Sequence, residues 1–174
     1  MLNKNFFELF SLPVSFAIDL AQLDQNYRSL QAEVHPDRFA AAAPAERRHS
    51  LQLATRVNEA YQTLKSPVAR ARYLLQMNGV DTQEETNTAM PAGFLMQQME
   101  WRETIEEGSA ARDIDALDEL QHELLRTATA LETELHESID QHRDYAHAAQ
   151  SVRKLRFLDK VRDEIERAID ALDE

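Results

Sequence analysis

The sequence of 174 residues predicts an all-α protein, an N-terminal helical hairpin followed by a C-terminal antiparallel three-helix bundle. The chain holds only three Gly and five Pro, and good helix formers such as Ala, Leu, Glu, Gln and Arg dominate its regular stretches. Apolar residues also recur every three or four positions along most of the chain, which is the pattern of amphipathic helices. Short connections between such helices favour antiparallel packing.

The N-terminal part predicts a short helix and then two long helices that fold back on each other. The short helix lies in FFELFSLP and is expected to stop at Pro13. Asp19 is the expected N-cap of the first long helix, and Ser66 with Pro67 marks the start of a further helix, KSPVARARYLL. The apolar stripes of the two long helices are Leu20, Leu23, Tyr27, Leu30 and Val34, and Leu53, Ala54, Val57, Tyr61 and Leu64.

The turn between the two long helices begins with His35-Pro36-Asp37. Pro36 lacks a backbone donor and pushes His35 out of the helical conformation, so the helix ends there. A helix stop alone explains neither His35 nor Asp37. With a helix folded back on each side, the three residues stand at an exposed apex with no core to serve, which fits a contact with another protein.

A catalytic role for this turn is not expected. His35 and Asp37 resemble a base and its partner, but a triad also needs a nucleophile and a shielded pocket. A hairpin tip offers neither, and the sequence has no Gly-rich phosphate loop. We therefore predict no catalytic residues and no enzyme.

The predicted domain boundary is the stretch that starts at Asn78-Gly79 and runs through VDTQEETNTAMPAG. It divides the chain into residues 1–77, a linker at 78–93, and residues 94–174. Residues 1–76 hold nine basic and seven acidic side chains, a net +2, whereas residues 77–174 hold ten and 24, a net −14. This asymmetry indicates two units that meet different surfaces, and it argues against nucleic acid as a partner of the second unit.

The second unit predicts helices at about 94–107, 112–139 and 146–172. The leucine-rich stripes of the last two helices supply the core of the predicted bundle. They consist of Ile114, Leu117, Leu120, Leu124, Leu131 and Leu135, and of Leu155, Leu158, Val161, Ile165, Ile169 and Leu172.

The first helix of the bundle, GFLMQQMEWRETIEEG, carries a second apolar face that a three-helix bundle does not require. At about 100° per residue, Phe94, Trp101 and Ile105 lie within about 40° of one another and form the core face. The second face and its acidic border comprise Leu95, Met96, Met99, Glu100, Glu103 and Glu107. One interpretation is that this face is buried, either in a wide core or against the first domain. The other is that it forms an exposed Met/Leu patch, which is typical of adaptable partner binding.

Phe157, in SVRKLRFLDK, poses a similar choice. It lies toward the edge of its apolar stripe, among Arg153, Lys154, Arg156 and Lys160. It either caps the core or extends the second apolar face across the groove.

Several classes of site are excluded by composition. The chain has no Cys, so it holds no disulfide and cannot ligate an iron–sulfur cluster through thiolates. Glu119 and His122 form the only Glu-x-x-His pair, well off the leucine stripe, so no metal site and no cofactor are expected. The N-terminus lacks a secretion signal and no stretch reaches the roughly 18 apolar residues of a membrane span. A cytoplasmic protein without membrane contact is expected.

The helix pair with His-Pro-Asp at its tip, preceded by YRSLQAEV and followed by VNEAYQTLKSPVARARYLL, resembles a J-domain. Two further stretches, FLMQQMEWRE and VRKLRFLDK, narrow the resemblance to the HscB family, the J-domain co-chaperones of iron–sulfur cluster assembly. The resemblance covers essentially the whole chain. It implies a J-domain that recruits a DnaK-type chaperone, HscA, and stimulates its ATPase, and a C-terminal domain that delivers the scaffold protein IscU.

The resemblance also implies roles for particular residues. His35, Pro36 and Asp37 would signal to the chaperone, with Arg28 and Arg38 adding positive charge to the docking face. The scaffold-binding surface would consist of Leu95, Met96, Met99, Glu100, Glu103, Glu107 and Phe157. The sequence departs from general J-domains because Arg28 is the only basic residue of its second helix. Docking by charge is therefore either weak or depends on Arg47 and Arg48 of the following helix. The alternative is a generic J-protein whose bundle serves dimerisation or another client.

Overall fold

The computed structural model describes residues 1–173, and those residues form helices, turns and loops with no strand. The all-α class is therefore confirmed. The chain divides into two compact units, Met1–Asn78 and Gly79–Glu174. No helix among the described residues is long and apolar enough to cross a membrane.

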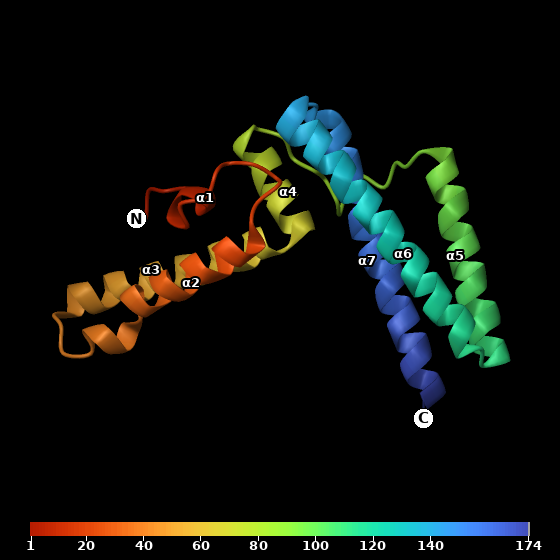
Figure 1. Ribbon diagram of the computed structural model, residues 1–174, viewed down its shortest axis with the longest axis horizontal. Coiled ribbons are helices and arrows are strands. Elements are labelled where there is room, and N and C mark those ends of the chain that lie inside the picture. The colour runs from red at the N-terminus through yellow and green to blue at the C-terminus, as the bar shows by residue number, and fades with distance from the viewer. Residues whose placement is uncertain (174) are drawn as a thin grey trace. The chain divides into compact units, whose positions relative to one another are not determined.

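The first unit contains four α-helices and one short 3₁₀-helix (Figure 1). They are α1 (Phe6–Leu9), α2 (Leu20–Val34), the 3₁₀-helix η1 (Pro36–Phe39), α3 (Pro44–Lys65) and α4 (Pro67–Met77). The predicted caps are confirmed, since the Asp19 carboxylate accepts from the Gln22 N–H at 3.1 Å and the Ser66 hydroxyl accepts from the Ala69 N–H at 3.3 Å. Such side-chain acceptors satisfy donors that the first turn of a helix leaves unpaired.

Helix α1 ends earlier than the sequence predicts. The last helical residue is Leu9, and Ser11 adopts a left-handed backbone conformation with φ 54°. The N–H groups of Ser11 and Leu12 turn back to the carbonyls of Glu8 and Phe7. The left-handed turn, and not Pro13, therefore stops the helix.

Helices α2 and α3 lie side by side and form the core of the first unit (Figure 1). Leu23, Leu30 and Val34 of α2 are buried against this core. Leu20 is exposed, contrary to the prediction, because at 100° per residue it points about 60° away from the mean direction of those three side chains. The Tyr27 and Tyr61 rings stack across the hairpin with centroids 3.9 Å apart.

The second unit is a three-helix bundle (Figure 1). It consists of α5 (Ala92–Ala111), α6 (Ile114–Leu135) with the π-helical turn η2 (His136–Gln141), and α7 (Tyr145–Asp173), and each long helix contacts the other two. The predicted leucine stripe of α6 is buried from Leu117 to Leu135. Gly108 lets α5 approach α6 closely, since a Cβ there would lie 3.1 Å from the side chain of Leu117.

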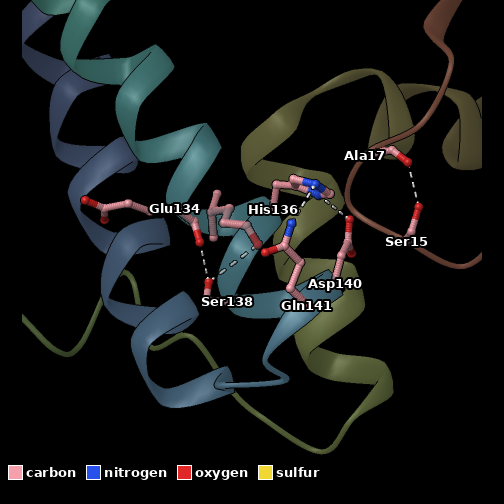
Figure 2. Close-up of polar contacts among 8 residues, drawn as sticks. Ser15, Ala17, Glu134, His136, Ser138, Asp140 and Gln141 are labelled. Atoms are coloured by element: carbon pink, nitrogen blue, oxygen red, sulfur yellow. Dashed lines mark hydrogen bonds and ion pairs between the residues drawn. The ribbon is translucent and has the colours of Figure 1, made fainter.

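The end of α6 differs from the prediction of one continuous helix to residue 139. The helix ends at Leu135 and continues as η2, in which Ser138 and Ile139 remain buried. The Ser138 hydroxyl donates to the Glu134 carbonyl at 2.7 Å, and His136 Nδ1 lies 2.8 Å from an Asp140 carboxylate oxygen (Figure 2). These local bonds stabilise a wider turn while the apolar side stays in the core.

Residues 79–91, which the sequence predicts as most of a linker at 78–93, belong to the second unit, and α5 starts at Ala92. We name residues 79–91 the strap because they lie along α7. Thr82 is buried, and its carbonyl accepts from Arg153 Nη1 at 3.2 Å. Glu85 forms an ion pair with Arg156 at 3.8 Å.

Candidate functional site

The His-Pro-Asp motif lies at the end of the α2–α3 hairpin that is farthest from α4 (Figure 1). His35 leaves the helical conformation, with φ −58° and ψ 129°, and Pro36 opens η1. The Asp37 N–H donates to His35 Nδ1 at 3.2 Å. The Asp37 side chain is 92% exposed. The tip thus presents an imidazole and a carboxylate to solvent.

Two side chains, those of Ser50 and Arg38, bind the end of α2 directly before this tip. The buried Ser50 hydroxyl of α3 donates to the Val34 carbonyl, directly before His35, at 2.8 Å. Arg38 Nη1 donates to the Ala32 and Glu33 carbonyls at 3.3 and 3.5 Å. Both satisfy carbonyls that the last turn of α2 leaves unpaired, and a cation at this end also complements the helix dipole.

Ser50 was not predicted, because the sequence interpretation counted only apolar residues in the stripe of α3. The signal was its spacing, since Ser50 lies three residues before Leu53 and seven before Val57 and therefore shares their buried face. Its role is to position the tip.

The basic residues predicted for the docking face remain at the surface. Arg28 on α2 and Arg38 on η1 are exposed, as are Arg47 and Arg48 near the start of α3. One nitrogen of Arg38 is committed to the end of α2, so Arg38 contributes structure as well as charge.

The second apolar face of α5 is open to solvent. Leu95 is 43%, Met96 64% and Met99 71% exposed. The acidic border, which consists of Glu100, Glu103 and Glu107, is exposed as well. The face is therefore not part of the bundle core.

The opposite side of α5 explains why this face has no place in the core. Trp101 is buried and its indole N–H donates to a Glu123 carboxylate oxygen at 3.2 Å. Gln98 and Gly108 are buried on the same side. Because this side already packs on α6 and α7, the second face is left free.

Phe157 of α7 is brought next to the start of α5. Its ring meets the Phe94 ring edge to face with centroids 6.5 Å apart, and Phe94 meets Trp101 in the same way at 6.0 Å. Lys160 lies over the Phe157 ring at 6.0 Å, and Lys154 lies over Phe94 at 5.6 Å. Phe157 is half-buried, so it both caps the core beside Phe94 and remains partly at the surface.

Glu119 and His122 lie on an open polar groove between α5 and α6, together with Thr104, Glu123 and Arg126. His122 Nδ1 lies 2.7 Å from the Asp118 carbonyl. Within residues 1–173, no three His, Asp or Glu side chains converge in a geometry that could hold a metal ion. The two exposed features, the tip and the α5 face, are thus the candidate site, and both are suited to binding proteins.

Known sequences that are similar to this chain match it over almost its whole length, and they share one description. A family model described as the HSCB C-terminal oligomerisation domain matches residues 90–166. The co-chaperone protein HscB homolog of Chromobacterium violaceum is 56% identical over 170 residues, which cover 98% of this chain and 96% of that protein. The corresponding protein of Paraburkholderia phymatum is 51% identical and covers 99% of this chain and 98% of its own length.

Solved structures that resemble this chain also include HscB proteins. The chaperone HscB from Vibrio cholerae matches with a TM-score of 0.86 and 37% identity, over 97% of this chain and 99% of that chain. The human co-chaperone protein HscB matches with a TM-score of 0.88 and 29% identity, over 95% of this chain and 82% of that chain. The similarity extends over both units.

Proposed function

The chain belongs to the HscB family of co-chaperones, and from this premise we propose that it couples two proteins in iron–sulfur cluster assembly. Its first unit stimulates the ATPase of a DnaK-type chaperone of the HscA kind. Its second unit binds the scaffold protein IscU and delivers it to that chaperone for cluster transfer. The chain activates another enzyme and performs no bond chemistry of its own.

The proposed chaperone contact is made by His35, Pro36 and Asp37, with Arg28 and Arg38 beside them. The tip is exposed, yet Ser50 and Arg38 bind the carbonyls at the end of α2 just before it. A rigid tip loses little conformational freedom on binding, which favours a specific contact. The net charge of +2 on residues 1–76, against −14 on the rest, supports the assignment of an electrostatic contact to this unit.

The observation that carries the proposal is the exposed apolar face of α5 in a chain that also presents the His-Pro-Asp tip. Contiguous exposed apolar patches mark protein-binding sites. Met and Leu adapt to the shape of a partner, and an acidic border of Glu100, Glu103 and Glu107 selects among partners by charge. Phe157 extends this scaffold-binding surface from α5 onto α7.

A second function is favoured by one observation, the description of the matching family model as an oligomerisation domain. In that case the α5 face binds a second copy of the chain, and the protein is a J-protein for other clients. The following experiment separates the two functions.

The tagged chain is used to capture proteins from a lysate of its own cell, next to a variant with Leu95→Ala and Met99→Ala. The wild-type chain is expected to retain both the HscA-type chaperone and IscU, and the variant only the chaperone. Capture of untagged copies of the same chain without IscU supports the oligomerisation function. Capture of neither partner by the wild-type chain overturns the proposal.

A further inference from the structure

The strap, residues 79–91, is bound to α7 by contacts that are far apart in sequence. These contacts are the Arg153–Thr82 hydrogen bond and the Glu85–Arg156 ion pair. Hydrogen bonds within the strap also fix its conformation. The Asn87 N–H donates to the Gln83 carbonyl at 2.8 Å, and the Thr82 hydroxyl donates to Glu84 at 2.6 Å. The strap is thus a defined loop held on one helix.

The part of α7 beneath the strap has an unusual charge. Four of the ten basic side chains among residues 79–174 lie between Arg153 and Lys160, whereas residues 79–174 together have a net charge of −14. Arg153, Arg156 and Lys160 recur every three or four residues and therefore share one face of α7. The acidic strap lies on this face and supplies the opposite charge.

Phe157 borders this face, because at about 100° per residue its direction differs from that of Arg153 by about 40°. Phe157, Arg156 and Lys160 line a small enclosed cavity of about 60 Å³, and strap residues from Glu84 to Met90 form its other wall. The strap therefore covers one side of the aromatic ring that we assign to scaffold binding.

The ion pair between the strap and α7 is weak. The Glu85–Arg156 pair is separated by 3.8 Å, and both side chains are substantially exposed. Exposed pairs of this kind are screened by salt and contribute little to stability. The part of the strap around Glu85 can therefore loosen from α7 while Thr82 stays buried. The bundle need not unfold, because its core lies on the opposite side of the helix.

We propose that the strap is an internal competitor of the scaffold, and that it covers the Phe157 end of the docking surface until IscU displaces it. This inference rests on the proposed function, because it assigns a regulatory element to the scaffold-binding surface. The apparent affinity for the scaffold is lowered in proportion to the fraction of chains whose strap is closed. Loosening the strap therefore strengthens scaffold binding.

The test uses the full chain with Glu85→Gln, which removes the ion pair with Arg156 and keeps the size of the side chain. Asp118→Asn is the matched control, since it makes the same change of charge at an exposed carboxylate of α6. Titration with purified IscU is expected to show binding about two- to fivefold tighter for Glu85→Gln than for Asp118→Asn. Equal affinities of the two variants overturn the competition.

Hydrogen exchange with and without IscU gives an independent readout. The amides of strap residues 82–90 are expected to exchange faster in the complex, while those around Leu95 and Met99 become protected. Strap amides that are unchanged or more protected in the complex overturn the competition, although protection of α5 still supports the proposed function. Absence of any binding by the wild-type chain overturns the proposed function itself, and the competition with it.

Discussion

Truncating the two apolar anchors of α5, Leu95→Ala together with Met99→Ala, is expected to weaken scaffold binding while leaving the fold intact. Leu95 is 43% and Met99 71% exposed in the free chain. Under the proposed function, a docked scaffold is expected to cover these exposed fractions. The change therefore removes contacts of the complex and few contacts of the bundle.

The structure sets the size of this effect. Burying a whole Leu or Met side chain contributes about 1.5–3 kcal/mol. Scaled by the exposed fractions, Leu95 contributes about 1 kcal/mol and Met99 about 1.5 kcal/mol to the complex. The dissociation constant is thus expected to rise about 60-fold. The free energy of unfolding is expected to change by no more than about 0.5 kcal/mol per site, as at other exposed positions.

Binding is measured by calorimetric titration with IscU, and folding by denaturant unfolding followed through the fluorescence of Trp101, the only tryptophan. Leu125→Ala is the matched control, because Leu125 lies on α6 and is also 43% exposed. The control is expected to bind like the wild type. Equal affinity of the double variant and the control would contradict scaffold binding by the α5 face. So would a loss of several kcal/mol of stability in the double variant, which is typical of a truncated core leucine.

Three further predictions concern the first unit. Ser50→Ala leaves the Val34 carbonyl buried without its hydroxyl donor and is expected to lower the free energy of unfolding by about 1–3 kcal/mol. The control Thr55→Ala, at an exposed hydroxyl of the same helix, is expected to lower it by no more than about 0.5 kcal/mol. Both values are measured by tyrosine near-ultraviolet circular dichroism during denaturant unfolding, and equal losses would contradict the role of Ser50. The hydrogen bond to Asp24 raises the pKa of Tyr61 above its ordinary value of 10.0. The stability from this group is therefore present below pH 10 and lost as the pH rises through the raised pKa. Asp24→Asn is expected to lower the pKa of Tyr61, measured as the difference between absorbance titrations with and without Tyr61→Phe, and an unchanged Tyr61 pKa would exclude this cause. Added salt is expected to raise the dissociation constant of the chaperone complex more than that of the apolar scaffold complex. A larger rise for the scaffold complex would contradict this assignment of charge.

Features that depend on a few neighbouring residues were predictable from the sequence. The caps at Asp19 and Ser66 need only a side chain and an N–H three residues later. The exposed face of α5 followed from angular spacing along one helix, because the directions of Phe94 and Met99 differ whatever the helix packs against.

Features that depend on distant residues or on backbone detail were not predictable. Ser50 contacts a carbonyl 16 residues away, and the strap contact of Arg153 spans 71 residues, so the neighbouring sequence does not show either partner. Spacing places Ser50 on the buried face of α3 but does not identify the Val34 carbonyl. Helix α1 ends early because Ser11 adopts the left-handed backbone conformation. This conformation is ordinarily a property of Gly, so the sequence pattern does not predict it at a serine. The turn η2 keeps Ile139 buried, so apolar periodicity alone could not separate it from α6.

The most direct test of the account is the rate of ATP hydrolysis by purified HscA, measured in a single turnover with the wild-type chain and with His35→Gln or Asp37→Asn. The wild-type chain is expected to accelerate hydrolysis. Both variants are expected to lose the acceleration while their free energies of unfolding stay within about 0.5 kcal/mol of the wild type and their affinity for IscU is unchanged. Full acceleration by both folded variants would contradict the assignment of the exposed tip as the signal to the chaperone.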